Sequence, residues 1–405
     1  MSTVPLLGVP SLDDMKVAIV TESFLPQTNG VVNSVLRVVE HLVSRGDQVL
    51  VICPDAREEV PTEVLGAQVV ALPSWSLPGY PDVRVATGRS APVEAVLRQF
   101  APDVVHLASP FVLGWRATLA AQALDLPVVA IYQTDVPRYA ERYGLPWTKR
   151  RLWRRVQDIH SRATVNLAPS VASIRELREH GVDRVRLWQR GVDCDLFDPS
   201  RRSHARRARI CLDGRKLVGF VGRLAPEKQV QDLVRLKNEP GVKLVIVGDG
   251  PERARLEQLL PDAHFTGMLH GEELAATMAA LDVLVSTSET ETFCQVVQEA
   301  LASGVPVVAS GVGGPLDLVD HSRTGWLYAP GDLDAMAGHV RDLVGDEAKR
   351  QAFGRDARRS VVLRGWRAIC SELVGHYARA VEEHHDLEPV DVGLVHWRTR
   401  RLSRR

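Results

Sequence analysis

The sequence predicts an α/β protein of two domains, each built around a doubly wound, parallel β-sheet. First, its 405 residues exceed one typical domain of about 100 to 200 residues. Second, short runs of β-branched residues alternate with helical patterns, which is typical of repeated βαβ units. Third, a polar stretch interrupts this alternation near the middle of the chain, and the alternation then begins again.

The composition, with 45% hydrophobic and 25% charged residues, is that of a globular protein with a packed core. Fifty basic residues balance fifty acidic ones, so no overall field attracts nucleic acid, and we expect no nucleic-acid partner. The five cysteines are scattered without metal-ligand spacing, which favours a reduced, cytoplasmic compartment and no metal site. Neither a signal peptide nor an 18-residue apolar run is present in the sequence, so we expect no membrane span.

The first domain is expected over residues 15–195 and is interpreted as a Rossmann-like acceptor domain. Its β-branched runs resemble buried parallel strands and begin at Lys16, Gln48, Gln68, Asp103 and Pro127. Between the first two runs, residues 31–46 carry apolar side chains at helical spacing and end at Gly46, which favours a helix.

The second domain is expected over residues 196–363, with an Arg-rich linker at 195–215. Its predicted strands begin at Leu217, Lys243, Asp282 and Pro306. Residues 361–384 then show a helical pattern, and we expect a helix at 364–385 to return to the first domain. The last residues, 386–405, are expected to form a basic tail.

The residues that follow the strands of the second domain carry the chemistry. In doubly wound folds, ligands bind beyond the carboxyl ends of the strands, where helix N-termini present unpaired N–H groups. Arg223 and Lys228 follow the first strand, whereas Glu291 and Glu299 flank a helix start after the third strand. A glycine-rich turn at 311–314 is predicted to form a backbone anion nest.

Together these groups suit a nucleotide diphosphate sugar, because cations and amides bind the diphosphate and carboxylates bind sugar hydroxyl groups. Taken separately, the pair Arg223 and Lys228, or Glu299 alone, is better explained as solvated surface charge. A carboxylate pair also occurs in glycosidases, but hydrolysis needs neither the cations nor the anion nest. The combination therefore favours transfer of a sugar.

These residues resemble a known family. Glu291 and Glu299 match the Glu-x7-Glu signature, and residues 222–228 match the Gly-Arg-Leu-x-x-Glu-Lys motif, of retaining GT-B glycosyltransferases of family four. The loop at Asn29 is similar to the glycine-rich loop of that family, and the similarity extends from about residue 16 to 384. Segments beginning at Tyr132, Gly219 and Glu291 resemble actinobacterial GDP-mannose-dependent α-mannosyltransferases.

The resemblance implies a GT-B fold and a retaining transfer of mannose from GDP-mannose to a membrane lipid or glycolipid acceptor. It also implies metal-independent catalysis without a cofactor, at the inner face of the cell membrane. Alternatives are a UDP-sugar-dependent GT-B transferase, a nucleotide-sugar epimerase, or a non-catalytic nucleotide-sugar binder.

The resemblance assigns catalysis to Arg223, Lys228 and Glu291. The expected donor-binding residues are Asn29, Gly30, Arg223, Lys228, Gly248, Glu291, Phe293, Cys294, Gln295 and Glu299. Cys294 is interpreted as a small buried residue, with a reactive thiol as the alternative.

An acceptor or sugar pocket is predicted at His106, Gln133 and Asp135. Gln133 stands where many relatives carry His, and an amide cannot hold or shuttle a proton as imidazole does. The alternatives are a core histidine for His106 and a turn-capping role for Asp135.

A basic amphipathic helix is predicted at 142–163, with an ordinary surface helix as the alternative. Such a helix binds an anionic leaflet through its cations and interfacial aromatic residues. The predicted membrane contacts are Trp147, Lys149, Arg150, Arg151, Trp153 and Arg154.

Overall fold

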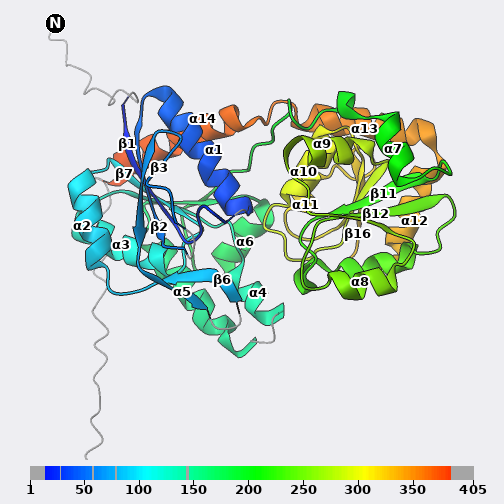
Figure 1. Ribbon diagram of the computed structural model, residues 1–405. Helices are drawn as coiled ribbons and strands as arrows, with labels where there is room; N and C mark the ends of the chain where they lie inside the picture. The colour runs from blue at the N-terminus through cyan, green and yellow to red at the C-terminus, as the bar shows by residue number, and fades with distance from the viewer. Residues whose placement is uncertain (1–13, 28, 57–58, 78–79, 143–145, 385–405) are drawn as a thin grey trace, which may run out of the picture.

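The computed structural model describes residues 14–27, 29–56, 59–77, 80–142 and 146–384. Figure 1 shows two lobes side by side, each with a central sheet between helices. Two sheets, one of eight strands that is parallel except at one edge strand and one of six parallel strands, confirm the predicted fold class. The predicted basic tail at 386–405 lies outside the described residues.

The first sheet has the strand order β10-β9-β8-β7-β1-β2-β4-β3. The short β3 runs antiparallel to β4, whereas the other neighbours pair in parallel. Its strands are β1 (Lys16–Thr21), β2 (Gln48–Pro54), β3 (Glu63–Val64), β4 (Ala67–Leu72), β7 (Val104–Ala108), β8 (Val128–Ile131), β9 (Val165–Ala168) and β10 (Val185–Leu187). A separate antiparallel hairpin contains β5 (Ser74–Leu77) and β6 (Tyr80–Ala86). The five predicted strands correspond to β1, β2, β4, β7 and β8.

The helices of this domain are α1 (Gly30–Arg45), α2 (Ala91–Phe100), α3 (Leu113–Ala123), α4 (Val136–Arg142), α5 (Lys149–Ser161), α6 (Val171–Glu179) and the 3-10 turn η1 (Pro146–Thr148). The predicted helix at 31–46 is confirmed as α1. Its end is set by Gly46, whose φ of 99° lies in the left-handed region that glycine adopts without strain.

The second sheet is parallel and has the order β13-β12-β11-β14-β15-β16. Its strands are β11 (Lys216–Val221), β12 (Val242–Val247), β13 (His264–Gly267), β14 (Val283–Ser286), β15 (Val307–Ser310) and β16 (Gly325–Tyr328). Its helices are η2 (Pro199–Arg201), α7 (His204–Ile210), η3 (Pro226–Lys228), η4 (Val230–Leu236), α8 (Arg253–Leu259), α9 (Gly271–Ala280), α10 (Gln295–Ala302), α11 (Pro315–Leu318), α12 (Leu333–Gly345) and α13 (Glu347–Val361).

The Arg-rich stretch that we expected to be a linker is folded onto the second domain. It contains η2 and α7, and α7 packs against α9. Arg202 and Arg207 donate to the two carboxylate oxygens of the buried Asp282, at 2.7 and 2.9 Å. The arginines therefore stabilise the start of β14, which explains the composition that suggested a linker.

The predicted C-terminal helix at 361–384 is interrupted. Helix α13 ends at Val361, and α14 (Trp366–His384) begins after a break where Val192 N donates to Arg364 O at 3.0 Å. The chain crosses between the domains twice, near Gly191 and again before Trp366. These two crossings touch, since a Cβ on Gly191 would lie 2.6 Å from Trp366 Cα. In Figure 1, α14 extends from the second lobe across the top of the first.

Helix α14 packs against α1, β7 and β8 through buried side chains. Trp188 Nε1 donates to Ile369 O at 3.0 Å, and the Tyr377 hydroxyl lies 2.7 Å from His106 Nδ1. His106 is 1% exposed, and burial lowers its pKa to about 3. The prediction of His106 as a pocket residue is therefore wrong, because it is a neutral core histidine beneath α14.

We expect Tyr377→Phe to lower the free energy of unfolding by about 1 to 3 kcal/mol, because it leaves the buried His106 Nδ1 without its partner. Urea unfolding monitored by circular dichroism measures this change. Tyr328→Phe is the control, since that hydroxyl has only a 3.5 Å contact with Ser286 O. Equal stability of the wild type and Tyr377→Phe would contradict the assignment.

Candidate active site

Two loops at the carboxyl edge of the second sheet are bonded to each other. The loop after β11 contains Glu227 and Lys228, and the loop after β14 begins at Thr287. Thr287 Oγ1 donates to Lys228 O at 2.7 Å, and Ser288 Oγ donates to Glu227 O at 3.2 Å. Lys228 Nζ then lies 2.5 Å from Glu291 Oε1. The sequence-predicted cation and carboxylate are thus in direct contact.

Arg223 is positioned by the carboxylate of Glu227, a residue that was not predicted as part of the site from the sequence. Its guanidinium forms an ion pair with Glu227, whose side chain is 1% exposed, whereas the Arg223 side chain is 57% exposed. The separation of four residues within the Gly-Arg-Leu-x-x-Glu-Lys motif was the available signal for this pair. Glu227 therefore orients a guanidinium that remains accessible to a ligand.

The glycine-rich turn after β15 does not form the predicted anion nest. The N–H of Gly311 donates to Tyr328 O at 2.7 Å, and that of Gly314 donates to Glu291 O at 2.8 Å. A Cβ on Gly313 or Gly314 would overlap backbone atoms of the segment from Glu291 to Phe293. These glycines therefore permit close packing that positions the Glu291 loop.

Gly248 has a similar packing role. Its φ of 134° lies outside the range that other residues adopt easily, and a Cβ there would overlap Gly222 O. Its N–H donates to Gly267 O at 2.9 Å. Gly248 thus brings the ends of β11 and β12 together at the edge of the predicted donor site.

Helix α10 begins directly after Cys294, which has a left-handed backbone at φ 74°. The thiol is 3% exposed, its Sγ lies 3.5 Å from Ser286 Oγ, and burial raises its pKa to about 12. Cys294 is therefore a neutral buried residue, as expected. Phe293 is 2% exposed, and Gln295 Nε2 donates to Gly191 O at 3.0 Å, so any ligand contact here would use backbone N–H groups.

Glu299 lies on α10, on the same loop-helix segment as Glu291. Burial raises the pKa of Glu299 to about 8, because desolvation disfavours the charged carboxylate. At neutral pH the carboxyl group therefore retains its proton in the ligand-free protein.

On the first domain, Asn29 is the N-cap of α1. Its Oδ1 accepts from Val31 N at 2.9 Å and Val32 N at 3.0 Å, while its Nδ2 donates to Ser23 Oγ at 2.8 Å. Gly30 is the first residue of the helix and is exposed. A Cβ on Gly30 would lie 2.8 Å from Arg190 Nη1, so a guanidinium sits at this helix start.

The other predicted pocket residues are largely buried. Gln133 is 6% exposed, and its Oε1 accepts from Arg190 Nη2 at 2.7 Å. Asp135 is 2% exposed; its Oδ1 accepts from Arg138 N at 2.9 Å at the start of α4. The turn-capping alternative therefore describes Asp135, and Arg190 is a residue that the sequence analysis missed.

The Glu291 loop also contacts the first domain. Thr292 Oγ1 donates to Gln133 O at 2.9 Å, and Arg138 Nη1 donates to Glu289 O at 3.1 Å. Elements from both domains therefore meet at the predicted site.

Five of the predicted membrane contacts are exposed and one is not. Trp147 is 70% exposed, and Lys149, Arg150, Arg151 and Arg154 are also exposed on or beside α5. Trp153 is only 6% exposed and stacks on His180 with ring centroids 3.6 Å apart. Its prediction as a membrane contact is wrong, because it faces the core below α5.

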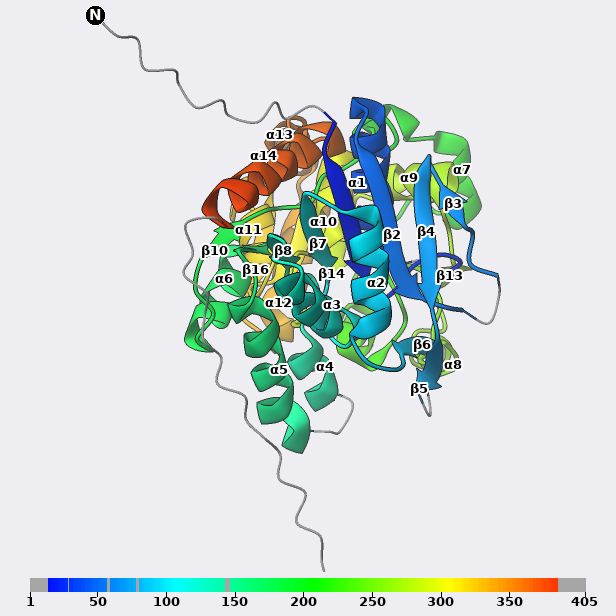
Figure 2. The same cartoon turned by 90° about the vertical axis from the view of Figure 1, so that its left-hand side faces the viewer.

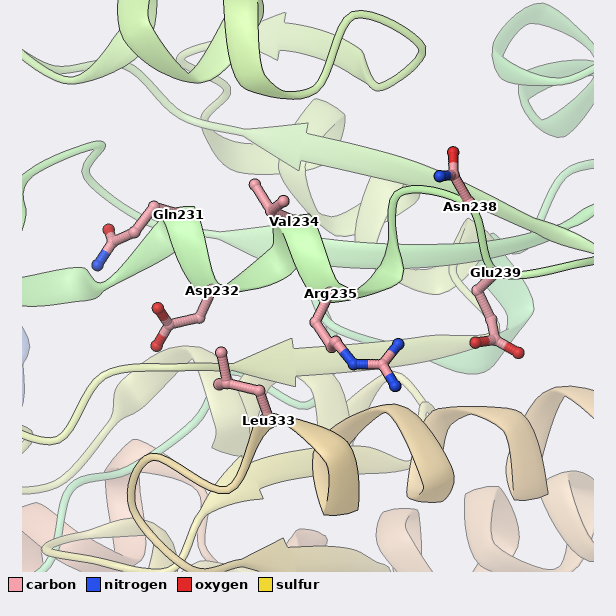
Figure 3. Close-up of a pocket in the computed structure, with 7 residues that line it drawn as sticks. All are labelled: Gln231, Asp232, Val234, Arg235, Asn238, Glu239 and Leu333. Carbon is pink, nitrogen blue, oxygen red and sulfur yellow. The ribbon is translucent and has the colours of Figure 1, made fainter.

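A hollow of about 470 Å³ between η4 and the start of α12 (Figure 3) is separate from these residues. Two of the charged side chains that line it form ion pairs, Arg235 with Asp334 and Glu239 with Arg341. Within the described ranges, no three His, Cys, Asp or Glu side chains are arranged to hold a metal ion. In the same part of the chain, no helix has both the length and the apolar character needed to cross a membrane.

Comparisons with known proteins match both domains. Residues 28–196 match the family model described as Glycosyltransferase Family 4, and residues 204–360 match the model described as Glycosyl transferases group 1. A GDP-mannose-dependent alpha-mannosyltransferase of Mycobacterium tuberculosis is 48% identical over 90% of this chain and 96% of its own length. Sulfoquinovosyl transferase SQD2 of Arabidopsis thaliana is 33% identical over 98% of this chain and 80% of its own length.

Among solved structures, Anabaena HepE in complex with UDP superposes with a TM-score of 0.72 at 19% identity. The match covers 90% of this chain and 100% of HepE. At this identity the likeness shows the fold, which is that of a GT-B glycosyltransferase.

We expect Glu299→Gln to flatten the pH dependence of stability. The unfolded chain releases the Glu299 proton near pH 4.5, whereas the folded chain holds it until about pH 8. The folded state therefore loses stability as pH rises through this window, and a glutamine, which has no such proton, does not. Melting temperatures between about pH 5 and 9 measure the effect. Glu382→Gln, at an exposed carboxylate of α14, is the control; parallel profiles for wild type and Glu299→Gln would contradict the assignment.

Proposed function

Because this chain belongs to the family 4 glycosyltransferases, we propose that it is a retaining α-mannosyltransferase. It uses GDP-mannose as the donor and a membrane lipid or glycolipid as the acceptor. The 48% identity to a GDP-mannose-dependent relative over most of both chains supports this donor. The observation that carries the proposal is the contact of Lys228 with Glu291, beside Arg223, at the edge where donors bind in this fold.

Arg223 and Lys228 stabilise the leaving group in this proposal. Breaking the bond from the anomeric carbon to the diphosphate creates an oxocarbenium-like sugar and a growing negative charge on phosphate oxygens. A helix N-terminus contributes about 0.3 to 1 kcal/mol to such a charge, whereas one preorganised donor contributes about 2.7 to 4 kcal/mol. The two cations therefore supply most of the stabilisation and take the place of a metal ion.

Glu291 and Glu299 bind the two sugars. Glu291 lies against the Lys228 ammonium and accepts hydrogen bonds from hydroxyl groups of the transferred hexose. Glu299 accepts hydrogen bonds from the hydroxyl groups of the ribose. The acceptor hydroxyl gives its proton to an oxygen of the leaving phosphate on the same face of the sugar. The buried, capping position of Asp135 accords with a mechanism that needs no side-chain base.

Radiolabelled GDP-mannose, incubated with the protein and a lipid extract, tests the donor. We expect organic-extractable label from GDP-mannose and far less from UDP-glucose. We further expect Arg223→Ala to lower kcat by roughly 10²- to 10³-fold, because it removes one donor to the developing charge.

Arg235→Ala is the matched control, since Arg235 lies on η4 of the same domain and pairs with Asp334. Near-normal turnover by folded Arg223→Ala would refute its role. Label transfer from the UDP-sugar alone would instead favour the UDP-dependent alternative, and no transfer from either would favour a binding protein.

We also propose that the protein binds the inner face of the cell membrane peripherally, through the exposed basic residues of α5 and Trp147. Helix α5 and the β5–β6 hairpin both lie at the lower end of the first domain (Figure 2). Trp75 on this hairpin is 76% exposed and adds a second aromatic side chain. Cations near an anionic leaflet contribute about 1 kcal/mol each, and tryptophan prefers the interface.

We expect the protein to co-sediment with phosphatidylglycerol vesicles, and this binding to weaken as salt screens the charges. The double variant Arg150→Glu, Arg151→Glu should lose most of the binding. Arg355→Glu, Arg359→Glu on α13 of the second domain makes the same change in net charge and should retain it. Equal binding to neutral phosphatidylcholine vesicles, or equal loss in both double variants, would rule out this surface.

A further inference from the structure

We propose that the second domain has a further ligand site, an amino-edge cavity that binds a small soluble molecule carrying several phosphate groups. The cavity has a volume of about 710 Å³, and small-molecule sites typically have about 300 to 1,000 Å³. It lies at the amino edge of the second sheet, where Lys216 begins β11 and where Asp282 and Pro306 precede β14 and β15. The predicted donor site lies at the opposite, carboxyl edge, so the two sites are separate.

One wall of the amino-edge cavity is a single face of α13. Seven residues from Glu347 to Arg359 line the cavity, and they recur at alternating intervals of three residues and one, which places them on one side of a helix. Four of the seven are arginines, Arg350, Arg355, Arg358 and Arg359. This helix face is therefore strongly basic, although basic and acidic residues are equal in number in the whole chain.

A distant segment of the chain adds more cations to the same cavity. Arg202, at the end of η2, and His204 and Arg207, on α7, also line it. In all, seven lysine and arginine side chains line the cavity, against the two carboxylates of Asp282 and Glu347. The Arg-rich stretch that resembled a linker in the sequence therefore converges with α13 on one basic cavity.

Four of these cations have structural partners in the fold. They donate to carbonyl groups at the carboxyl ends of α9, α10 and α12, and they are Arg202, Arg207, Arg350 and Arg358. A cation at a helix carboxyl end stabilises the helix by about 0.3 to 1 kcal/mol, so these four need no ligand to explain them. Lys216, Arg355 and Arg359 make no such contact with a helix end.

The charge of the amino-edge cavity stays positive when all these partners are counted. Its seven cations pair with four carboxylates, which leaves three positive charges; the carboxylates are those of Asp198, Asp282, Glu347 and Asp356. The three helix ends offset about half a charge each, so about 1.5 positive charges remain. Among the residues that the structure describes, none forms a hydrogen bond or ion pair with the exposed Arg355 side chain.

The cations without a helix end are accessible to a ligand. The Lys216 side chain is 30% exposed and that of Arg359 is 76% exposed. Arg355 and Arg359 are one helical turn apart, where like charges repel, and an anion between them relieves that repulsion. Guanidinium groups bind phosphate through two parallel hydrogen bonds, and lysine binds it as a point charge. A ligand with two or more phosphate groups therefore suits this set.

Lipid headgroups and soluble molecules both carry phosphate, and the position of the cavity favours a soluble ligand. In Figures 1 and 2, α7 and α13 lie at the top of the molecule, whereas α5, the proposed membrane contact, lies at the bottom. A protein that rests on a leaflet through α5 therefore presents the amino-edge cavity to the solution.

Calorimetric titration with pyrophosphate tests the proposal on the full chain. We expect the wild type to bind pyrophosphate at the cavity as well as at the donor site. The double variant Arg355→Glu, Arg359→Glu should weaken binding at the cavity by about tenfold or more, because it removes charge-assisted hydrogen bonds. Arg223→Ala, at the donor site, should retain the binding event at the cavity.

Arg235→Glu, Arg255→Glu is the matched control, because it makes the same change in net charge on η4 and α8, outside the cavity. A pyrophosphate affinity of the cavity variant within twofold of this control would overturn the proposal. Complete loss of pyrophosphate binding in Arg223→Ala would also overturn it, since all of the ligand would then bind at the donor site.

Acetylation of lysine side chains, followed by mass spectrometry, locates the ligand. Pyrophosphate should slow the acetylation of Lys216, which lines the cavity, and leave that of Lys243 on β12 unchanged. An unchanged rate at Lys216, or equal slowing at both lysines, contradicts binding at this place. Loss of phosphatidylglycerol vesicle binding by the cavity variant would identify a lipid headgroup and overturn a soluble ligand.

Discussion

The rest of the site depends on one ion pair, between Lys228 and Glu291, in which Nζ lies 2.5 Å from Oε1. The two residues are 63 positions apart, and the hydrogen bonds that the Thr287 and Ser288 hydroxyl groups donate to Lys228 O and Glu227 O hold their loops together. Gly313 and Gly314, which have no side chain, allow the loop after β15 to pack closely against the backbone from Glu291 to Phe293. A binding edge built in this way is preorganised, so little of the energy of donor binding is used to assemble it.

Much of the fold could be predicted from the sequence because buried parallel strands are continuous β-branched runs. Strands β1, β2, β11 and β12 are of this kind, whereas β9 and β10 are only four and three residues long and leave no such run. The two site carboxylates, Glu291 and Glu299, were found because their spacing matches a known signature. Arg190 and Glu227 were not, because their significance comes from contacts with distant residues such as Gly30 or from burial.

The wrong predictions have a common physical cause. His106 and Trp153 lie in segments whose other residues were placed correctly, but each side chain faces inward, toward Tyr377 and His180 respectively. A pattern of residue types along a strand or helix shows its two faces and not what covers them. The glycine-rich turn illustrates the same limit, because flexible backbone for anion binding and close packing against Phe293 both require glycine.

The contact between Gly191 and Trp366 has a mechanical consequence. Both passages of the chain between the lobes run through this one place, so any change in the angle between the lobes would turn about it. Arg190 lies next to this contact and is bonded to both lobes, to Gln133 of the first and to Gln298 on α10 of the second. The hydrogen bonds from Thr292, Arg138 and Val171 also join the two lobes, at a distance along the chain from this contact, and a wider angle between the lobes would require them to break.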